Sequence, residues 1–324
     1  MPKSKKSYQI IWAIDPFEKK GETQAAVVSS LRQITAGYGV NQTKIQPVYM
    51  LSPSEFDLSL NLADSWSKEY EESTKKILDQ CLKNVDLPNL LPPKIIIQRH
   101  PSLRESAKSL LTFAKRSRAQ LIAVGTHSRK GLFRLFLGSF AETLLLYSKT
   151  PLLVVNPSAV SRSAKRASHQ KVKSLDKILF ATDLGKHAPL LFKKVLEFAK
   201  NLQSKIVLFH AISHPVEPLI QSGVYLLSGA MMQWPDFLSQ HEQEKRTVAE
   251  RYASLARAKG VSLEVVVTSA HTNVSSLILE QAKKSQAGLI AMGAESGLVS
   301  TTLIGSITRQ VAREAPCPIW VMHL

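Results

Sequence analysis

Short apolar runs alternate along the chain with longer stretches in which apolar residues recur at helical spacing. In the second half, "KILFATD" and "KIVLFHA" flank "HAPLLFKKVLEFAKNLQS", whose apolar residues fall mostly on one face of a helix. These residues are Leu190, Leu191, Val195, Leu196, Phe198 and Ala199. A long helix at 238–259 is followed by the runs "LEVVVTS", "GLIAMG" and "CPIWVM", with a helical pattern between each pair. Five strands alternating with helices predict an α/β fold with a parallel sheet, and right-handed crossovers restrict it to the doubly wound kind.

The two halves of the chain repeat one another in order. "IIWAID", which ends at Asp15, corresponds to "ILFATD", which ends at Asp183, at an offset of 168 residues. "LIAVG" corresponds to "LIAMG" at the same offset, whereas a Gly-Ser pair and the run "TPLLVV", matched by "CPIWVM", recur at an offset of 167. These matches predict two copies of one domain, over 1–156 and 176–324. The segment 157–175 is rich in Ser, Lys and Arg, which is typical of a linker.

A candidate ligand site follows from the expected strand order, 3-2-1-4-5. In such sheets ligands bind at the carboxyl ends of the strands, where the direction of winding reverses, here between strands one and four. Asp15 ends the first strand and Gly125 ends the fourth, so we expect these two residues at one crevice. Gly125 and Gly131 let the loop turn tightly, and Gly138 with Ser139 precedes a predicted helix, whose first amides suit an anion.

Two features of this loop allow different interpretations. Arg129, Lys130 and Arg134 add positive charge beside the glycines, which would favour an anion, although such side chains also commonly face solvent. Ser139 and Glu142 have the S-x-x-E spacing of a capping box. A capped helix after a glycine turn needs no ligand, so the pattern alone does not decide between a binding loop and a simple turn.

The loop resembles that of the universal stress protein family, whose ATP-binding members carry G-x2-G-x9-G-[S/T] after strand four. Gly125, Gly138 and Ser139 stand at the family spacing, whereas Ser128 replaces the middle glycine. Because the resemblance covers both halves, the chain is similar to a tandem universal stress protein with two Rossmann-like, nucleotide-hydrolase-like domains. The last strand of each sheet is an expected edge, and the resemblance implies that these edges pair and make an intramolecular pseudo-dimer.

The resemblance also implies that the first copy binds ATP, with or without Mg. Asp15 would contact the ribose, and the end of strand two, around Tyr49 and Met50, would border the adenine. The expected binding residues are Asp15, Met50, Gly125, His127, Ser128, Gly131, Gly138 and Ser139. In the second copy Glu295 stands where the first has His127, and the loop is one residue shorter. The negative charge of Glu295 disfavours a polyphosphate, so we expect ATP in the first copy only.

Composition narrows the classes of partner and compartment. The net charge of +17 is concentrated in the first copy and the linker, but no RNP, KH or zinc-finger pattern accompanies it, which favours a solvated basic surface over nucleic-acid binding.

Cys81 and Cys317 are far apart and indicate neither a disulfide framework nor a zinc site. His210 and His214 have i, i+4 spacing, but they lie where a strand ends, which argues against a metal site. Without an apolar span or a signal-peptide pattern, we expect no membrane association and a cytoplasmic protein.

These observations predict a nucleotide-binding regulatory protein of the stress response. Two alternatives stay open: a nucleotide-free scaffold whose sheets support protein partners, and a slow ATP hydrolase. No base, nucleophile or Mg-binding acid pair is evident beyond Asp15, which argues against an enzyme. The Met and aromatic cluster in "SGVYLLSGAMMQWPDFL" is expected to pack under a long loop rather than to meet a lipid or a partner. The stress signal, the partners and the association of two chains into a homodimer stay undecided.

Overall fold

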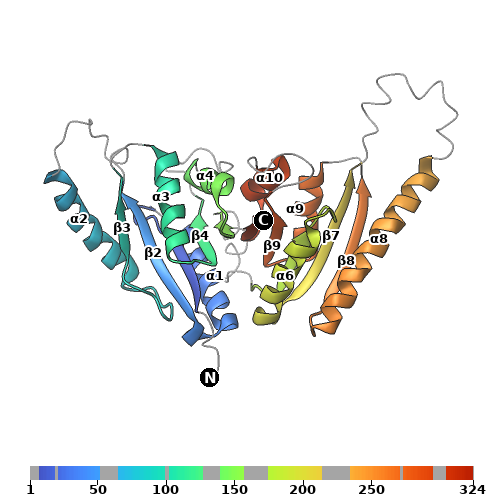
Figure 1. Ribbon diagram of the computed structural model, residues 1–324, viewed down its shortest axis with the longest axis horizontal. Coiled ribbons are helices and arrows are strands. Elements are labelled where there is room, and N and C mark those ends of the chain that lie inside the picture. The colour runs from blue at the N-terminus through green and yellow to red at the C-terminus, as the bar shows by residue number, and fades with distance from the viewer. Residues whose placement is uncertain are drawn as a thin grey trace, which may run out of the picture.

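The computed structural model describes residues 7–18, 21–51, 65–98, 102–126, 139–156, 174–213, 234–270, 273–294 and 304–323. Two similar α/β halves lie side by side (Figure 1). The first half contains β1 (Tyr8–Ala13), α1 (Glu22–Tyr38), a short 3-10 turn (Val40–Gln42), β2 (Thr43–Leu51), α2 (Ser65–Leu82), β3 (Lys94–Ile97), α3 (Leu103–Arg116), β4 (Leu121–Gly125), α4 (Ser139–Tyr147) and β5 (Leu152–Val155). The second contains β6 (Lys177–Ala181), α6 (Ala188–Leu202), β7 (Lys205–Ser213), α8 (Trp234–Ala258), β8 (Leu263–Ala270), α9 (Val274–Lys284), β9 (Leu289–Gly293), α10 (Ser306–Glu314) and β10 (Ile319–Met322).

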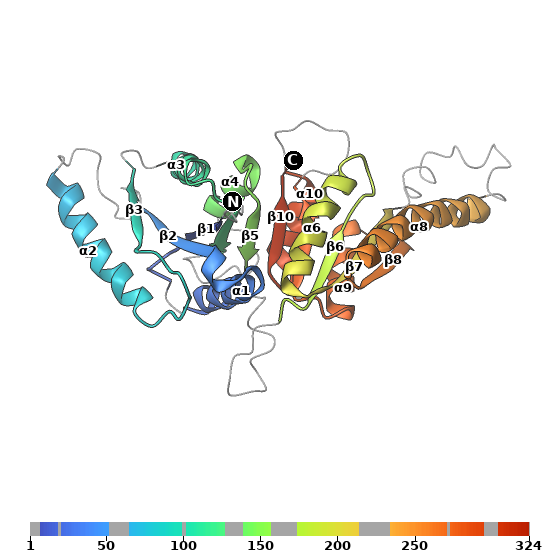
Figure 2. The same cartoon turned by 60° about the horizontal axis from the view of Figure 1, so that its bottom comes forward.

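The strands form one ten-stranded sheet in the order β3-β2-β1-β4-β5-β10-β9-β6-β7-β8. Each half is parallel and has the order 3-2-1-4-5, which confirms the doubly wound prediction. The two halves join where β5 pairs antiparallel with β10, with Leu153 opposite Trp320 (Figure 2). The final strands therefore cover each other's edges, as the pseudo-dimer requires.

Helices cover both faces of the sheet, and each face has its own apolar core. One core contains Ile10, Trp12 and Tyr49 with buried residues of α1, α2, α6 and α8. The other contains Ile11 and Met50 with buried residues of α3, α4, α9 and α10. Neighbouring residues of a strand point to opposite faces, so Tyr49 and Met50 belong to different cores.

Helix α6 shows how the apolar pattern is used. Its buried face consists of Ala188, Leu191, Phe192, Val195, Phe198 and Ala199. Leu190, which the pattern placed among the apolar positions, is 57% exposed. The prediction of one buried face is confirmed without this residue. No helix among the described residues combines the length and apolar character of a membrane span.

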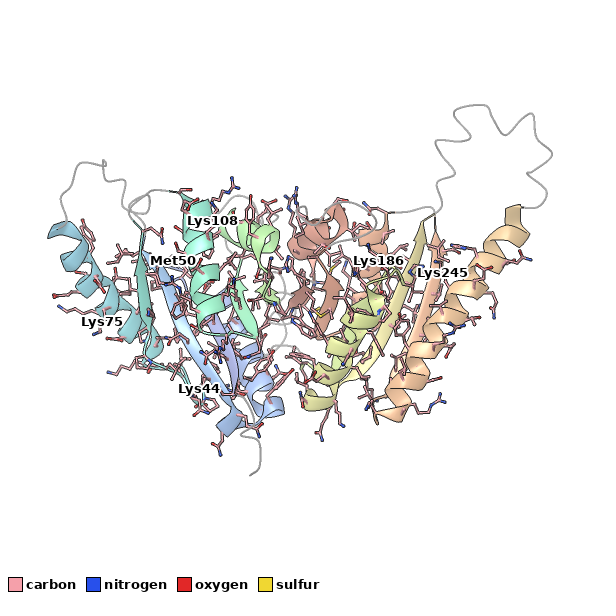
Figure 3. The ribbon with its side chains drawn as sticks, in the orientation of Figure 1. Lys44, Met50, Lys75, Lys108, Lys186 and Lys245 are labelled. Carbon is pink, nitrogen blue, oxygen red and sulfur yellow. The ribbon has the colours of Figure 1, made fainter. Side chains whose placement is uncertain are left out.

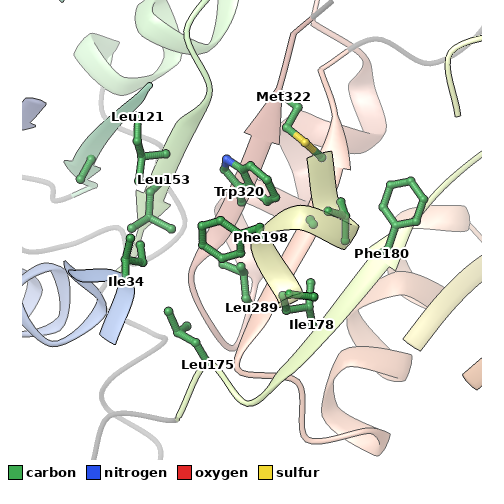
Figure 4. Close-up of a cluster of buried hydrophobic side chains, with 14 of the residues drawn as sticks. Ile34, Leu121, Leu153, Leu175, Ile178, Phe180, Phe198, Leu289, Trp320 and Met322 are labelled. Carbon is green, nitrogen blue, oxygen red and sulfur yellow. The ribbon is translucent and has the colours of Figure 1, made fainter. Parts of the chain in front are cut away.

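Aromatic side chains cross the join between the halves. The ring centroids of Tyr38, at the end of α1, and Phe198 lie 5.9 Å apart. Phe198 in turn stacks on Trp320, with ring centroids 4.4 Å apart (Figure 4). Gly37 permits this approach, because a Cβ there would lie 2.9 Å from the carbonyl oxygen of Asn201. The sheet pairing and the helix contact together bury the surface between the halves.

Polar side chains at equivalent positions also bridge the halves. Asn156, after β5, donates its amide to the carbonyl oxygens of Ala312 and Ala315 at 3.4 and 3.1 Å. His323, after β10, places Nε2 2.8 Å from the carbonyl oxygen of Leu145. Each of these residues therefore satisfies carbonyl groups near the end of a helix in the other half.

A carboxylate and two guanidinium groups meet between α4 and α10. Glu142 Oε1 lies 3.2 Å from Nε of Arg309 and 3.9 Å from Nη2 of Arg313. Helix α4 begins at Ser139, whose side chain lies outside the described residues, so the capping box stays a prediction. Glu142 and Arg309 occupy the same place in the repeat, the fourth residue of α4 and of α10. The duplicated domains thus carry opposite charges at one equivalent position.

Candidate functional site

Strands β1 and β4 are adjacent and parallel, with Ala13 opposite Val124. Asp15 follows β1 by two residues and Gly125 is the last residue of β4, so both lie at the same edge of the sheet. A pocket at this edge is lined by Trp12, Ala13, Ile14, Asp15, Glu18, Thr23, Gln24, Val27 and Gly125. Its volume of about 30 Å³ holds about two water molecules. The described walls therefore enclose far less space than a whole nucleotide needs.

Asp15 organises the turn that follows β1. Its Oδ1 accepts a hydrogen bond from the backbone N–H of Phe17 at 2.9 Å. The ring of Phe17 then lies edge-on to Tyr49, with centroids 5.9 Å apart. The thiol of Cys81, on α2, donates to the carbonyl oxygen of Pro16 at 3.6 Å, and burial, together with the charge of Asp15, raises the pKa of this thiol. The thiol is thus held in its neutral form beside the turn.

Glu18 caps helix α1 from the preceding loop. Its two carboxylate oxygens accept from the backbone N–H groups of Thr23 and Gln24 at 2.8 and 2.9 Å. The N-cap residue, Gly21, has a left-handed conformation with φ of 63° and no side chain that could serve as a cap. The carboxylate of Glu18 therefore supplies the acceptor that most helices take from a capping Ser, Thr, Asp or Asn.

Gly125 lets α1 lie close to the end of β4. A Cβ at this position would lie 2.6 Å from Cγ2 of Thr23, which is only 1% exposed. The Thr23 hydroxyl is buried and has no hydrogen-bond partner in the described structure. The pocket wall thus contains two carboxylates and one polar hydroxyl whose bonding capacity is unused.

The structure brings some of the predicted site residues together. Asp15 and Gly125 line one pocket. Met50 is buried in the core on the α3 and α4 face (Figure 3) and does not line this pocket. Tyr49 belongs to the core on the opposite face, with buried residues of α1 and α2. Ser139 begins α4, and its side chain lies outside the described residues. His127, Ser128, Gly131 and Gly138 lie outside the described residues altogether.

Glu18 and Thr23 were not anticipated from the sequence. The available signal was local: a glycine at position 21 just before an apolar helical pattern, with an acidic residue three positions earlier. A capping acid normally lies at or next to the helix start, whereas Glu18 lies four residues before Glu22, the first residue of α1. A capping contact made from that position leaves no periodic pattern in the sequence.

The equivalent edge of the second half is built differently. Asp183 Oδ1 accepts from the backbone N–H of Gly185 at 2.9 Å, much as Asp15 does. The N-cap residue of α6, His187, makes no side-chain capping bond. His210, in the place that Tyr49 has in the first half, contacts the carbonyl oxygen of Thr182 through Nδ1 at 2.8 Å. Burial lowers the pKa of His210, which keeps the imidazole neutral near pH 7.

Other candidate chemistry receives no structural support within the described part of the chain. No group of three or more His, Cys, Asp or Glu side chains there could hold a metal ion, and His214 lies outside it. Cys81 and Cys317 are not joined in a disulfide. The lysines labelled in Figure 3 are spread over both halves. Glu295, Arg129, Lys130 and Arg134 lie outside the described residues.

Comparison with known proteins identifies a family. The model of the universal stress protein family matches residues 38–156 and 174–323. Among solved structures, a universal stress protein from Archaeoglobus fulgidus is 17% identical, covers 97% of this chain and 98% of its own, and superposes with a TM-score of 0.62. A putative universal stress protein from Pseudomonas aeruginosa is 14% identical over 99% of this chain and 94% of its own, with a TM-score of 0.54. A search of curated proteins found no match.

Proposed function

Because the chain belongs to the universal stress protein family, as its two matched segments show, we propose that its first copy binds a nucleotide at the pocket between β1 and β4. The supporting observation is the convergence of Asp15 and Gly125, which come from separate strands, at the point where the winding of the sheet reverses. A carboxylate such as that of Asp15 accepts hydrogen bonds from sugar hydroxyls, and Gly125 allows close approach of a ligand.

The nucleotide of this proposal is ATP, with or without Mg, bound in the first copy only. Gly138 and Ser139 would receive the phosphates at the amino end of α4, where unpaired amides favour an anion. Glu295 in the second copy would oppose a polyphosphate. Domain extents of 1–156 and 176–324, a cytoplasmic location, a role in the stress response and protein partners also stay predictions.

Titration calorimetry with ATP on a pair of equivalent variants tests the proposal. Gly138→Val places a branched side chain at the expected phosphate position and should abolish binding. Gly305→Val makes the same change at the equivalent glycine of the second copy, the N-cap of α10, and should leave binding nearly unchanged. Equal losses in the two variants, or a loss in Gly305→Val alone, would show that the site lies in the other copy or in neither.

The same experiments separate the two alternatives. If the unmodified chain shows no heat of binding with ATP, and the denatured purified protein releases no nucleotide, the nucleotide-free scaffold replaces this proposal. Release of inorganic phosphate from ATP that disappears in Asp15→Ala would assign slow hydrolysis to the first copy. Binding without phosphate release identifies a nucleotide-binding protein that is not an enzyme.

A further inference from the structure

Two helices have their amino ends at the ligand edge of the first half. Helix α1 follows β1, helix α4 follows β4, and these two strands are neighbours in the sheet. The first N–H groups of a helix have no partner within the helix, and the helix dipole adds positive potential there, so each end can attract an anion. An anionic ligand at this edge would therefore have two competing places for its charge.

At α1 this place is already taken by the protein itself. Glu18 binds the N–H groups of Thr23 and Gln24 with both carboxylate oxygens, at 2.8 and 2.9 Å. This two-point contact is the one that a phosphate would make with the second and third amides of a helix. A phosphate placed there would have to displace Glu18 and would meet Asp15, which lines the same pocket.

The composition of the pocket wall also bears on which ligand group fits this end of the pocket. Thr23 lines the pocket and is 1% exposed, and its hydroxyl has no hydrogen-bond partner among the described residues. A buried hydroxyl without a partner is costly, and its neighbours in the pocket wall are acidic or apolar except for Gln24. The wall, as far as the described residues form it, contains no Lys, Arg or His side chain. A neutral group with hydroxyl donors suits this wall better than an anion does.

We propose that Glu18 acts as a built-in anion that closes the amino end of α1 and so fixes the direction in which a ligand lies. Neutral sugar hydroxyls meet the wall formed by Asp15, Glu18 and Thr23, and phosphate groups are turned toward α4. Glu18 is a specificity-determining residue in this arrangement. The direction of the nucleotide rests on the proposed function, whereas the exclusion of anions from α1 does not depend on it.

Inorganic phosphate is the probe that tests this exclusion. Glu18→Ala removes the carboxylate and leaves both amides free, so phosphate should bind at least about tenfold more tightly than to the unmodified chain and should raise the thermal midpoint at constant ionic strength. Glu18→Gln keeps one oxygen acceptor without the charge, and should show a smaller gain. It also keeps the test usable if Glu18→Ala folds poorly.

Ser102→Ala is the matched control, because the Ser102 hydroxyl caps α3 by accepting from the backbone N–H of Glu105 at 3.4 Å, away from the pocket. This variant should gain no phosphate binding. An equal gain in Ser102→Ala would show that phosphate binds any uncapped helix, and phosphate binding of the unmodified chain equal to that of Glu18→Ala would show that Glu18 excludes nothing. No gain in either Glu18 variant would show that α1 is not an anion site. Each of these three results overturns the proposal.

Titration with ATP separates this proposal from the proposed function. If the unmodified chain binds no ATP while Glu18→Ala gains phosphate, nucleotide binding fails and the exclusion of anions stands. If ATP binds and Glu18→Ala gains no phosphate, the reverse holds. If both succeed, Gly138→Val should abolish ATP binding in the unmodified chain, but should weaken it less in a chain that also carries Glu18→Ala, because α1 then offers a second place for the phosphates.

Discussion

Reversing the charge of Glu142 tests whether the two halves are held together by a contact that two identical domains could not make. Glu142 is the one carboxylate seen to face Arg309 and Arg313 in the described part of the join. Glu142→Arg would bring three guanidinium groups together between α4 and α10. Adding Arg309→Glu to the same chain would restore an attraction with the signs exchanged.

The magnitude follows from the distances and the exposure of the three side chains. Two unit charges about 4 Å apart near a protein surface attract by about 4 kcal/mol before desolvation and side-chain entropy are subtracted. Glu142 is 29% exposed and the two arginines 38% and 39%, and the Nε of Arg309 lacks the alignment of a hydrogen bond. The net contribution of such a pair is therefore about 1 kcal/mol. We expect Glu142→Gln to lower the free energy of unfolding by about 1 kcal/mol and Glu142→Arg by about 2 kcal/mol.

Urea unfolding at low and high salt measures these differences. The double variant that combines Glu142→Arg with Arg309→Glu should recover about half of the loss caused by Glu142→Arg alone, and the loss itself should shrink in about 1 M salt because the charges are partly exposed. Glu105→Gln is the control, because Glu105 pairs within α3, with Lys108 at 2.7 Å and with both side chains about half exposed. A double variant as unstable as Glu142→Arg, or a loss no larger than that of Glu105→Gln, would refute a role of this contact in joining the halves.

Three further changes test other parts of the structure. Gly125→Ala should lower the free energy of unfolding by about 1–3 kcal/mol, because its Cβ would lie 2.6 Å from Cγ2 of buried Thr23; an unchanged urea midpoint would contradict this close approach. Since burial lowers the pKa of His210, its charging opposes folding, so stability should be full above about pH 6.5 and fall as the pH drops through the lowered pKa. His210→Asn should flatten this fall, and an equal slope in both chains would exclude His210 as its source. Asn156→Ala should cost about 1–2 kcal/mol by removing its two hydrogen bonds to the carbonyl groups at the end of α10, whereas no cost would mean that water replaces them.

The strand order was predictable because it rests on periodicity and on the repeat, which are properties of the whole chain. The runs ending at Asp15 and Gly125 predicted in the same way that these two residues meet at one edge of the sheet, and both line one pocket there. Grouping Tyr49 with Met50 overlooked that consecutive strand residues face opposite sides of a sheet, and the two residues lie in different cores. The capping of α1 by Glu18 comes from a residue four positions before the helix, and no period in the sequence encodes such a contact.

Fusion of the two copies explains why equivalent positions can differ across the join. In a dimer of identical domains a residue near the two-fold axis meets its own copy, so two glutamates or two arginines would face each other. Within one chain Glu142 meets Arg309, which is its counterpart in the repeat, and the contact is attractive. The same freedom allows Tyr49 in one copy and His210 in the other at corresponding strand positions. Pairing of two first halves would bring two glutamates together, and pairing of two second halves would bring two arginines together. The repulsion between like charges therefore favours pairing of each half with the other. The candidate ligand edges of the two halves are then free to diverge.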